Sequence, residues 1–363
     1  MTRRKDGTYQ EALTINGKRK YFYGKTKAEV LKKIRAYEEK QDNGPLVSEA
    51  VAMWLAEKEK TVSFKTREGY NTPVQRIEHY FGNTFAKDVT PAQIQAFING
   101  IAAQGYKRTT VQRPLDVLRM VYDFLIVQED SVVRVNPWYG VRLPSGLKQE
   151  ARDLMTREQV EIIKRSVAEP FGLFPYLIMY SGLRDGEALA LRYEDFTDTH
   201  IIVDKNLSWQ PNKPVIKEPK TKSGIRKVDL LQPLKNALPK KWTGYLFSAD
   251  GGETPLTNTQ FRARWNQYCR SVGLAYCEIE THKSAGANNR TYERKVWHNT
   301  ITPYQLRHEF ATICFDAGLD PHDVKDLMGH ASEEMARRVY THILNSRREK
   351  TSKKLNDYVN NVY

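Results

Sequence analysis

The first forty residues change from an alternating apolar and polar pattern to a helical one. Residues 9–15 and 18–23 alternate as strands do, and Asn16-Gly17 between them is typical of a tight hairpin turn. Residues 27–40 then place apolar side chains on one helical stripe, with Thr26 before them as an N-cap. The pattern predicts a small N-terminal sheet followed by a helix.

A break at Gly44-Pro45 separates this start from a stretch with helical spacing throughout. Thr90 and Pro91 form a cap and first-turn pair within it, which marks the start of one helix. The apolar spacing predicts four amphipathic helices, packed into a compact helical region. They cover residues 46–55, 70–81, 94–101 and 111–126.

Proline and glycine punctuate residues 134–146, which predicts a linker to a larger final region. Beyond it, Thr156 is a candidate N-cap, and helical stretches alternate with β-like ones. The predicted helices cover residues 156–168, 171–191, 257–272 and 302 onward, and the β-like runs cover residues 200–203 and 214–230.

A chain of 363 residues is too long for one ordinary core, so these regions predict a multidomain protein. The predicted fold class is α+β and mostly helical. Residues 1–44 form a small β-sheet plus helix, residues 45–140 a helical bundle, and residues 150–363 a mixed α/β domain with a C-terminal tail.

Composition adds an expected partner and compartment. Lysine and arginine total 57 against 43 acidic residues, a surplus of 14 positive charges that favours nucleic acid or an anionic surface. Residues 1–45 hold twelve of these cations against six acidic groups, a density suited to phosphate contact or to a solvated basic face. No apolar run suits a membrane span or a secretory signal, and three cysteines predict reduced thiols. We expect a cytoplasmic protein.

Several reaction classes lose support because their motifs are absent from the sequence. It has no Walker-type phosphate loop, no His-Glu-x-x-His metal signature and no fixed-period repeat. Residues 276–300 contain Cys277, His282 and His298, but without metal-ligand spacing, so a solvent loop or hairpin is expected there. We therefore expect neither a metal nor another cofactor.

Two arginines and a lysine suggest phosphodiester chemistry without a metal. An attack on a phosphodiester requires its non-bridging oxygens to be neutralised, and a guanidinium fork grips two of them at once. Arg184 and Arg307, on separate predicted helices, suit this task. Lys220 or Lys222, in a predicted β-hairpin, suits the role of general acid for the leaving oxygen.

A tyrosine near the C-terminus is the candidate nucleophile. Tyr340 follows Arg337 and Arg338, whose charges favour the phenolate form of a group with an ordinary pKa of about 10. His330 lies upstream and is placed to hydrogen-bond the phosphate or the phenol. Each residue alone has a structural explanation, and their ordered combination favours the catalytic one.

This combination resembles the tyrosine recombinase family, and more closely the integrases of conjugative transposons and temperate phages. Ser181-Gly-Leu-Arg184-Asp-Gly-Glu187 is similar to the family's first box, and Thr302-Pro-Tyr-Gln-Leu-Arg307-His308 to its second. Leu327-Met-Gly-His330, Tyr340-Thr-His342 and the lysine segment Lys220-Thr-Lys-Ser-Gly-Ile-Arg226 resemble the remaining elements. The motifs span residues 180–342 in the family's order.

The resemblance implies a site-specific recombinase and a role for each matching residue. Tyr340 would form a 3′-phosphotyrosyl bond, Arg184 and Arg307 would bind the phosphate, Lys220 would protonate the 5′ oxygen and His330 would assist by hydrogen bonding. Tyr304 departs from the family, which has histidine or lysine there to accept the proton of the nucleophile. A tyrosine is a poor base near neutrality. His308, one turn on, is the alternative acceptor, although a packing role is favoured for it.

The resemblance also implies how the regions act. Residues 1–44 would bind arm DNA sites with a three-stranded sheet, and the helical region with the catalytic domain would clamp core sites on double-stranded DNA. Four protomers would assemble on DNA and exchange C-terminal segments such as residues 346–363, with an accessory directionality factor as a further partner. The expected location is the bacterial nucleoid. Two alternatives stay open: a regulatory DNA-binding protein that has lost catalysis, and a type IB topoisomerase-like enzyme.

Overall fold

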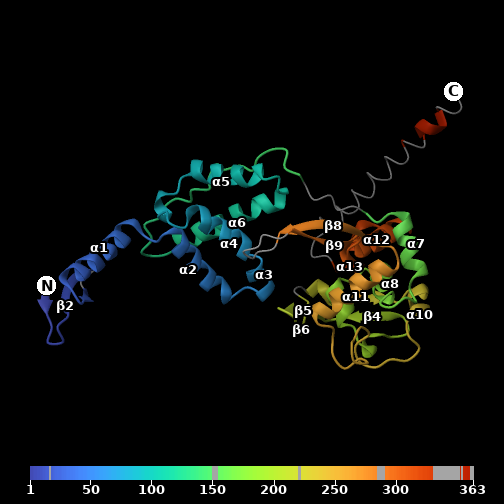
Figure 1. Ribbon diagram of the computed structural model, residues 1–363. Helices are drawn as coiled ribbons and strands as arrows, with labels where there is room; N and C mark the ends of the chain where they lie inside the picture. Colours follow the sequence, from blue (N-terminus) through green and yellow to red (C-terminus); the bar gives the residue numbers. More distant parts are fainter. Residues whose placement is uncertain are drawn as a thin grey trace. The chain divides into compact units, whose positions relative to one another are not determined.

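The computed structural model describes residues 1–15, 18–148, 154–219, 222–283, 291–329, 352 and 355–359. The chain divides into two compact units, Met1–Ala151 and Arg152–Tyr363. Both combine helices with small sheets, so the predicted α+β and mostly helical class is confirmed (Figure 1). Among the described helices, none is long and apolar enough to cross a membrane.

The first unit begins with a three-stranded antiparallel sheet in the order β1-β2-β3. The predicted pair of strands and the following helix are confirmed, and the Asn16-Gly17 turn lies outside the described residues. Thr26 caps the helix as expected, because its hydroxyl accepts a hydrogen bond from the backbone N–H of Glu29 at 3.2 Å. Val30 and Ile34 are buried against the sheet, whereas Leu31, predicted on the same stripe, is 46% exposed. The bounds are β1 Thr2–Arg3, β2 Tyr9–Ile15, β3 Lys18–Gly24 and α1 Lys27–Asn43.

The helical region of the first unit contains the four predicted helices. Thr90 caps α5 through the backbone N–H of Gln93, and Pro91 occupies the first turn. The short helix α3 was not predicted, because its five residues bury no apolar side chain. Trp54, Ile77, Ile98 and Leu118 lie at the centre of an apolar core. The bounds are α2 Val47–Glu59, α3 Phe64–Glu68, α4 Asn71–Phe81, η1 Ala86–Asp88, α5 Pro91–Ala103 and α6 Arg108–Ile126.

The second unit packs helices around an apolar core with two-stranded sheets at its surface. Phe174, Leu177, Ile178 and Leu306 are fully buried in this core, which joins α8 to α12. Thr156 caps the helix that follows it, as the sequence predicts. Thr257 and Thr302, where the sequence predicts two further helices to begin, are caps as well. The helices are α7 Arg157–Arg165, α8 Leu173–Ser181, α9 Asp185–Ala190, η2 Tyr193–Asp195, α10 Gln232–Ala237, α11 Asn258–Ser271, α12 Pro303–Asp316 and α13 Pro321–Met328.

The predicted continuous helix over residues 171–191 is wrong, because the chain breaks into α8 and α9. Gly182 ends α8 in the left-handed region, with φ of +63°. A side chain there would also overlap the Phe310 ring of α12, so glycine suits this position on two grounds. The break makes Arg184 the N-cap residue of α9 rather than a residue within a long helix.

The predicted β-hairpin around Lys220 and Lys222 is also wrong. Strand β6 pairs with β5, while β7 pairs with β4, so the segment between β6 and β7 connects two separate sheets. A 3₁₀ turn, η3, lies in this connection. The bounds are β4 His200–Val203, β5 Asn206–Gln210, β6 Lys213–Lys217, η3 Lys222–Gly224 and β7 Arg226–Asp229.

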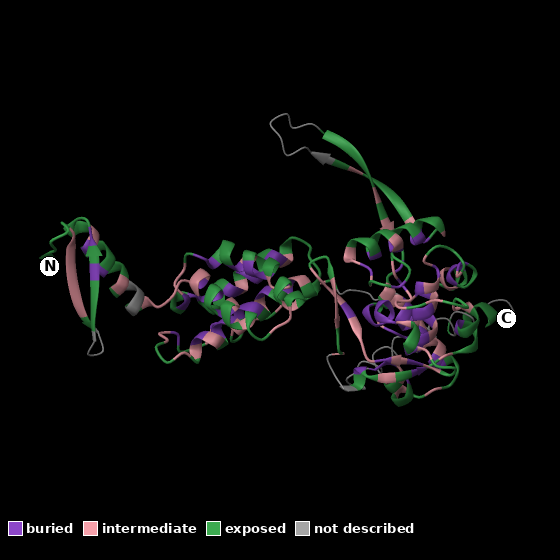
Figure 2. Ribbon diagram, turned by 90° about the horizontal axis from the view of Figure 1, so that it is seen from below, coloured by how far each residue is buried: buried purple, intermediate pink, exposed green. Residues whose placement is uncertain are grey.

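The polar stretch before α12 forms the expected hairpin. Strands β8, Ala275–Lys283, and β9, Thr291–Asn299, pair antiparallel over nine residues each. Figure 2 shows that most of the described residues of both strands are exposed as the hairpin extends from the second unit. Tyr276, with its ring stacked on that of His298 at 5.3 Å, is half exposed.

Candidate active site

Arg307 is the most deeply buried of the candidate residues. It lies in the second turn of α12, a helix that begins sharply because Thr302 caps it and Pro303 fixes its first turn. The residue is only 3% exposed. Its guanidinium donates one hydrogen bond to the carbonyl oxygen of Gly182 and another to that of Met328. Arg307 thus joins the end of α8 to the end of α13.

Arg184 approaches the same place from the N-terminus of α9. Its backbone N–H and its Nη1 both donate to the carboxylate of Glu187, at 2.9 and 2.6 Å, as in a helix-capping arrangement. Its Nη2 donates to the carbonyl oxygen of Gly329 at 2.9 Å. The side chain stays 40% exposed, so part of its fork faces solvent. A solvent-facing guanidinium of fixed orientation is suited to receive an anion.

Glu187 is the acidic residue of this cluster, and it stays ionised. Burial by itself would raise the pKa of its carboxyl group, because a buried charge is poorly solvated. The hydrogen bond and charge of Arg226, together with those of Arg184, outweigh burial and lower the pKa below its ordinary value. The side chain is 2% exposed, and it accepts from Arg226 Nη2 at 2.9 Å.

The cluster carries more positive than negative charge. Burial, followed by the positive charge of Arg184, lowers the pKa of Arg307 to about 9. This value still leaves the guanidinium charged at neutral pH. Arg184 and Arg226 repel Arg307, and Glu187 offsets part of this repulsion. A bound phosphate would relieve this repulsion, which is the electrostatic arrangement of an anion site.

Three arginines converge on the last three carbonyl oxygens of one helix end. Arg226 Nε donates to Leu327 at 3.0 Å, Arg307 to Met328, and Arg184 to Gly329. Carbonyls at a helix C-terminus lack intrahelical partners and carry partial negative charge, so cations stabilise them. The end of α13, directly before position 330, is therefore fixed by these three side chains.

Tyr304 lies one turn before Arg307 on the same helix. Its side chain is 44% exposed, and its ring meets the His308 ring edge to face with centroids 4.4 Å apart. His308 is buried, which agrees with the packing role favoured for it. Residues three apart share a helix face, so Tyr304 and Arg307 point to the same side of α12.

Three of the six predicted site residues, Lys220, His330 and Tyr340, lie outside the described residues. Lys222 is described through its backbone, as the first residue of η3. The structure thus brings together Arg184 and Arg307 of the six predicted site residues, with Tyr304 on the helix of Arg307. The roles of all six stay predictions.

Arg226 also belongs to the cluster, although the sequence motifs predict no role for it. Its strand alternates in burial, with Val228 buried and its neighbours Lys227 and Asp229 exposed. Since side chains two apart on a strand share a face, Arg226 points inward with Val228. A charged residue at an inward-facing strand position was the signal that it has a specific partner.

A second group of titratable side chains lies on the β8–β9 hairpin. Single ligand atoms of Glu278, Glu280 and His298 all lie within 4.8 Å of one another. The His298 Nε2 atom is 3.5 Å from Glu278 and 3.9 Å from Glu280, which are distances of ion pairs to a protonated imidazole. The three side chains lie on the two paired strands of one exposed hairpin.

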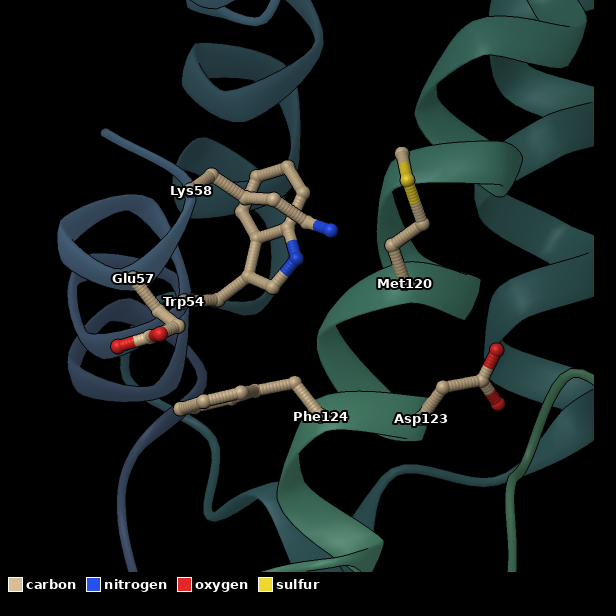
Figure 3. Close-up of a pocket in the computed structure, with 6 residues that line it drawn as sticks. All are labelled: Trp54, Glu57, Lys58, Met120, Asp123 and Phe124. Carbon is tan, nitrogen blue, oxygen red and sulfur yellow. The ribbon is translucent and has the colours of Figure 1, made fainter. Parts of the chain in front are cut away.

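The helical region has a pocket of about 350 Å³ between α2 and α6. Figure 3 shows the Trp54 indole nitrogen directed toward the space between the two helices, with Met120 across from it. Among the described residues, none accepts a hydrogen bond from this nitrogen. Glu57 and Lys58 contribute charges of opposite sign to its lining. No predicted site residue lines the pocket, and its mixed chemistry does not indicate a particular ligand.

Sequence comparisons agree with the geometry of the cluster. The phage integrase family pattern matches residues 154–347, and the phage integrase N-terminal SAM-like domain matches residues 46–102. The protein belongs to the phage integrase family. It is a tyrosine-type site-specific DNA recombinase, as predicted, and the regulatory and topoisomerase-like alternatives are not favoured.

Named relatives lie at low identity over most of the chain. A tyrosine recombinase XerC-like protein of Caldanaerobacter subterraneus is 24% identical, covering 96% of each chain. The ICEBs1 integrase of Bacillus subtilis is 23% identical, covering 78% of this chain and 75% of its own.

Solved structures share the fold. The Tn1549 transposon integrase in complex with transposon right end DNA matches with a TM-score of 0.62 at 20% identity, covering 85% of this chain and all of that one. A lambda integrase tetramer bound to a Holliday junction matches with a TM-score of 0.55 at 17% identity, covering 91% and 95%.

Proposed function

We propose that this recombinase cleaves and rejoins DNA strands with Tyr340 as its nucleophile. The phenolic oxygen attacks the phosphorus, the bond to the 5′ oxygen breaks, and a 3′-phosphotyrosyl bond forms. The reverse attack by a 5′ hydroxyl of another strand releases the tyrosine. Because the covalent bond preserves the phosphoester energy, neither step requires a nucleotide cofactor.

The convergence of Arg184 and Arg307 on adjacent carbonyls is the observation that carries this proposal. Both guanidinium groups are held by protein acceptors before DNA arrives, so little reorganisation accompanies phosphate binding. Arg184 presents the exposed part of its fork, while buried Arg307 adds charge from below. The scissile phosphate would bind where these two charges meet.

The remaining roles follow from chemistry and from the family resemblance. Lys220 donates a proton to the 5′ oxygen as it leaves, with Lys222 as the alternative donor. His330 hydrogen-bonds the phosphate, and its position directly after the fixed Gly329 supports this role. Tyr304 occupies the helix face of Arg307 and takes part through hydrogen bonds, with His308 as the other candidate for the phenolic proton.

The wider assembly is part of the same proposal. Residues 1–44 bind arm sites, residues 45–140 bind core sites, and residues 150–363 form the catalytic domain. Four protomers act together on double-stranded DNA in the bacterial cytoplasm, on the nucleoid, with an accessory factor that selects integration or excision. The DNA complexes of related integrases and the surplus of positive charge support this proposal.

Covalent trapping on a nicked DNA duplex tests the reaction. The nick lies beside the cleavage site, so the short cleaved fragment diffuses away and the adduct accumulates. The wild type should form a protein–DNA adduct that survives denaturation, and Tyr340→Phe should form none, because it lacks the attacking oxygen. Tyr358→Phe serves as a control, since Tyr358 is an exposed tyrosine in the same C-terminal segment.

Two results would contradict the proposal. An adduct that persists in Tyr340→Phe would assign the nucleophile to another residue. If Tyr358→Phe loses the adduct while Tyr340→Phe still forms it, the nucleophile is Tyr358.

A further inference from the structure

Arg226 makes contacts with three separate segments of the second unit. Its side chain is 7% exposed at the start of β7. Nε donates to Leu327 of α13 at 3.0 Å, Nη1 to Gly224 of η3 at 3.3 Å, and Nη2 to Glu187 of α9 at 2.9 Å. Each nitrogen of the guanidinium therefore holds a different element.

The turn η3 and the end of α13 also touch directly. Gly329 has φ of +62°, and a side-chain carbon there would lie 2.9 Å from the Ser223 carbonyl oxygen and 3.0 Å from Arg226 Nη1. Only a residue without a side chain permits such an approach, and glycine also accepts this backbone conformation at no steric cost. Arg226 lies at the junction where the two segments meet.

Glu187 extends the connection to the phosphate-binding residue. One of its carboxylate oxygens accepts from Arg226 and the other from the Arg184 guanidinium. The carboxylate is 2% exposed, so the pair is shielded from solvent and little screened. A cation at position 226 therefore balances one oxygen of Glu187, and the other oxygen holds Arg184.

We infer that Arg226 is a positioning residue of the active site, which holds the turn η3, beginning two residues after Lys220 in the sequence, against the end of α13. This inference rests on the proposed function, because it assigns Arg226 the task of aligning the general-acid lysine with the bound phosphate. Arg226 itself does not touch the reacting atoms. Its effect acts on the proton given to the 5′ oxygen.

Lysine cannot replace arginine in this role. The planar fork offers donors in several fixed directions, whereas an ammonium group is a single point on a flexible stem. Arg226→Lys would keep the charge beside Glu187 but could not reach Leu327, Gly224 and Glu187 together. The charge-conserving variant therefore separates alignment from electrostatics.

Single-turnover cleavage of two nicked substrates tests the inference. One substrate has the natural oxygen at the 5′ bridging position of the scissile phosphate, and the other has sulfur, which leaves as a thiolate without needing a proton. Arg226→Lys should cleave the oxygen substrate about 100-fold more slowly than the wild type. It should cleave the sulfur substrate at nearly the wild-type rate.

Matched variants guard against a trivial loss of folding. Lys227→Met removes a cation from the exposed neighbouring position of β7 and should leave both rates unchanged. Arg226→Lys keeps a cation beside the buried Glu187, so it leaves no buried charge without a partner.

The outcomes separate this inference from the proposed function. If Arg226→Lys slows cleavage of both substrates equally, or of neither, the inference that Arg226 aligns the lysine is wrong. A wild type that forms no adduct with either substrate would instead overturn the proposed reaction, and the inference with it. A wild-type adduct combined with selective loss on oxygen supports both.

Discussion

The helical region and the active-site cluster are held together by different forces. In α2 to α6 the buried residues are apolar, and a buried tyrosine, Tyr122, satisfies its hydroxyl on the carbonyl of Ala86 at 2.9 Å. Among the described residues, the buried charged ones, Glu187, Asp195 and Arg307, all lie in the second unit. Apolar packing specifies the first region, and charges bound to helix ends specify the second.

The difference shows where stability and chemistry are separated. An apolar core gains free energy from removing surface from water. In the cluster, three arginines surround one glutamate, so their like charges repel one another, and a bound anion would reduce this repulsion. The second arrangement is therefore tuned to a ligand more than to the folded state. Each prediction below would break or sharpen that contrast.

The largest effect is expected for Arg307→Met. Cleavage should fall about 1,000-fold, because a preorganised donor to the transition-state charge is lost. The free energy of unfolding should change by less than about 2 kcal/mol. The variant loses two hydrogen bonds, but it also removes a buried charge that is repelled by Arg184, and the two effects offset each other. Single-turnover cleavage and equilibrium unfolding measure the two quantities.

The matched variant in the helical region is Leu118→Ala. Leu118 is fully buried, so its truncation should cost about 2–5 kcal/mol of unfolding free energy while cleavage by the folded fraction persists. A reversal of the two patterns, with Arg307→Met the more destabilising, would remove the contrast between the regions.

A smaller effect is expected for Gly182→Ala. The new methyl group must accept a φ of +63° and would overlap the Phe310 ring, so we expect a cost of about 2–4 kcal/mol. Cleavage should slow as well, because the Gly182 carbonyl holds Arg307. Urea unfolding and single-turnover cleavage measure both effects.

Gly105→Ala in the helical region isolates the backbone contribution. Gly105 has φ of +77° but no neighbour within 4 Å, so strain alone should cost about 1–2 kcal/mol. Equal costs at the two glycines would mean that contact with Phe310 contributes nothing.

The smallest effect concerns acid stability and Glu187. A carboxyl whose folded pKa lies below its ordinary 4.5 contributes stability that is complete above 4.5 and lost as pH falls through the folded value. Glu187→Gln should therefore lose less stability than the wild type as pH falls below 4.5. Melting curves at several pH values measure it, with the exposed Glu158→Gln as control. A similar slope for wild type and Glu187→Gln would contradict the ionised state.

The sequence predicted the helical region better than the active-site cluster. Helical periodicity and threonine caps such as Thr90 and Thr302 are local signals, so the helix starts agreed closely with the structure. The break at Gly182 was missed because apolar residues continue across it, and the turn depends on contact with Phe310. Pairing of β6 with β5 and of β7 with β4 is likewise set by distant partners.

The candidate residues followed the same division. Arg184 and Arg307 were found because their motifs are contiguous in the sequence, and the structure places them at one helix end. The role of Arg226 was not found, because its partner Leu327 lies 101 residues away. Contiguous motifs identify Arg184 and Arg307 as candidate residues, whereas a contact such as that of Arg226 with Leu327 becomes visible only in the fold.

The three arginines of the cluster donate their hydrogen bonds at the end of α13 to backbone carbonyl oxygens, which every amino acid has. The side chains of Leu327 and Met328 take no part in these hydrogen bonds and contribute only to apolar packing. Length is the strict requirement: inserting or deleting one residue before Gly329 would rotate all three acceptors by about 100° around the helix axis. Substitutions should accumulate in this helix far more readily than insertions or deletions.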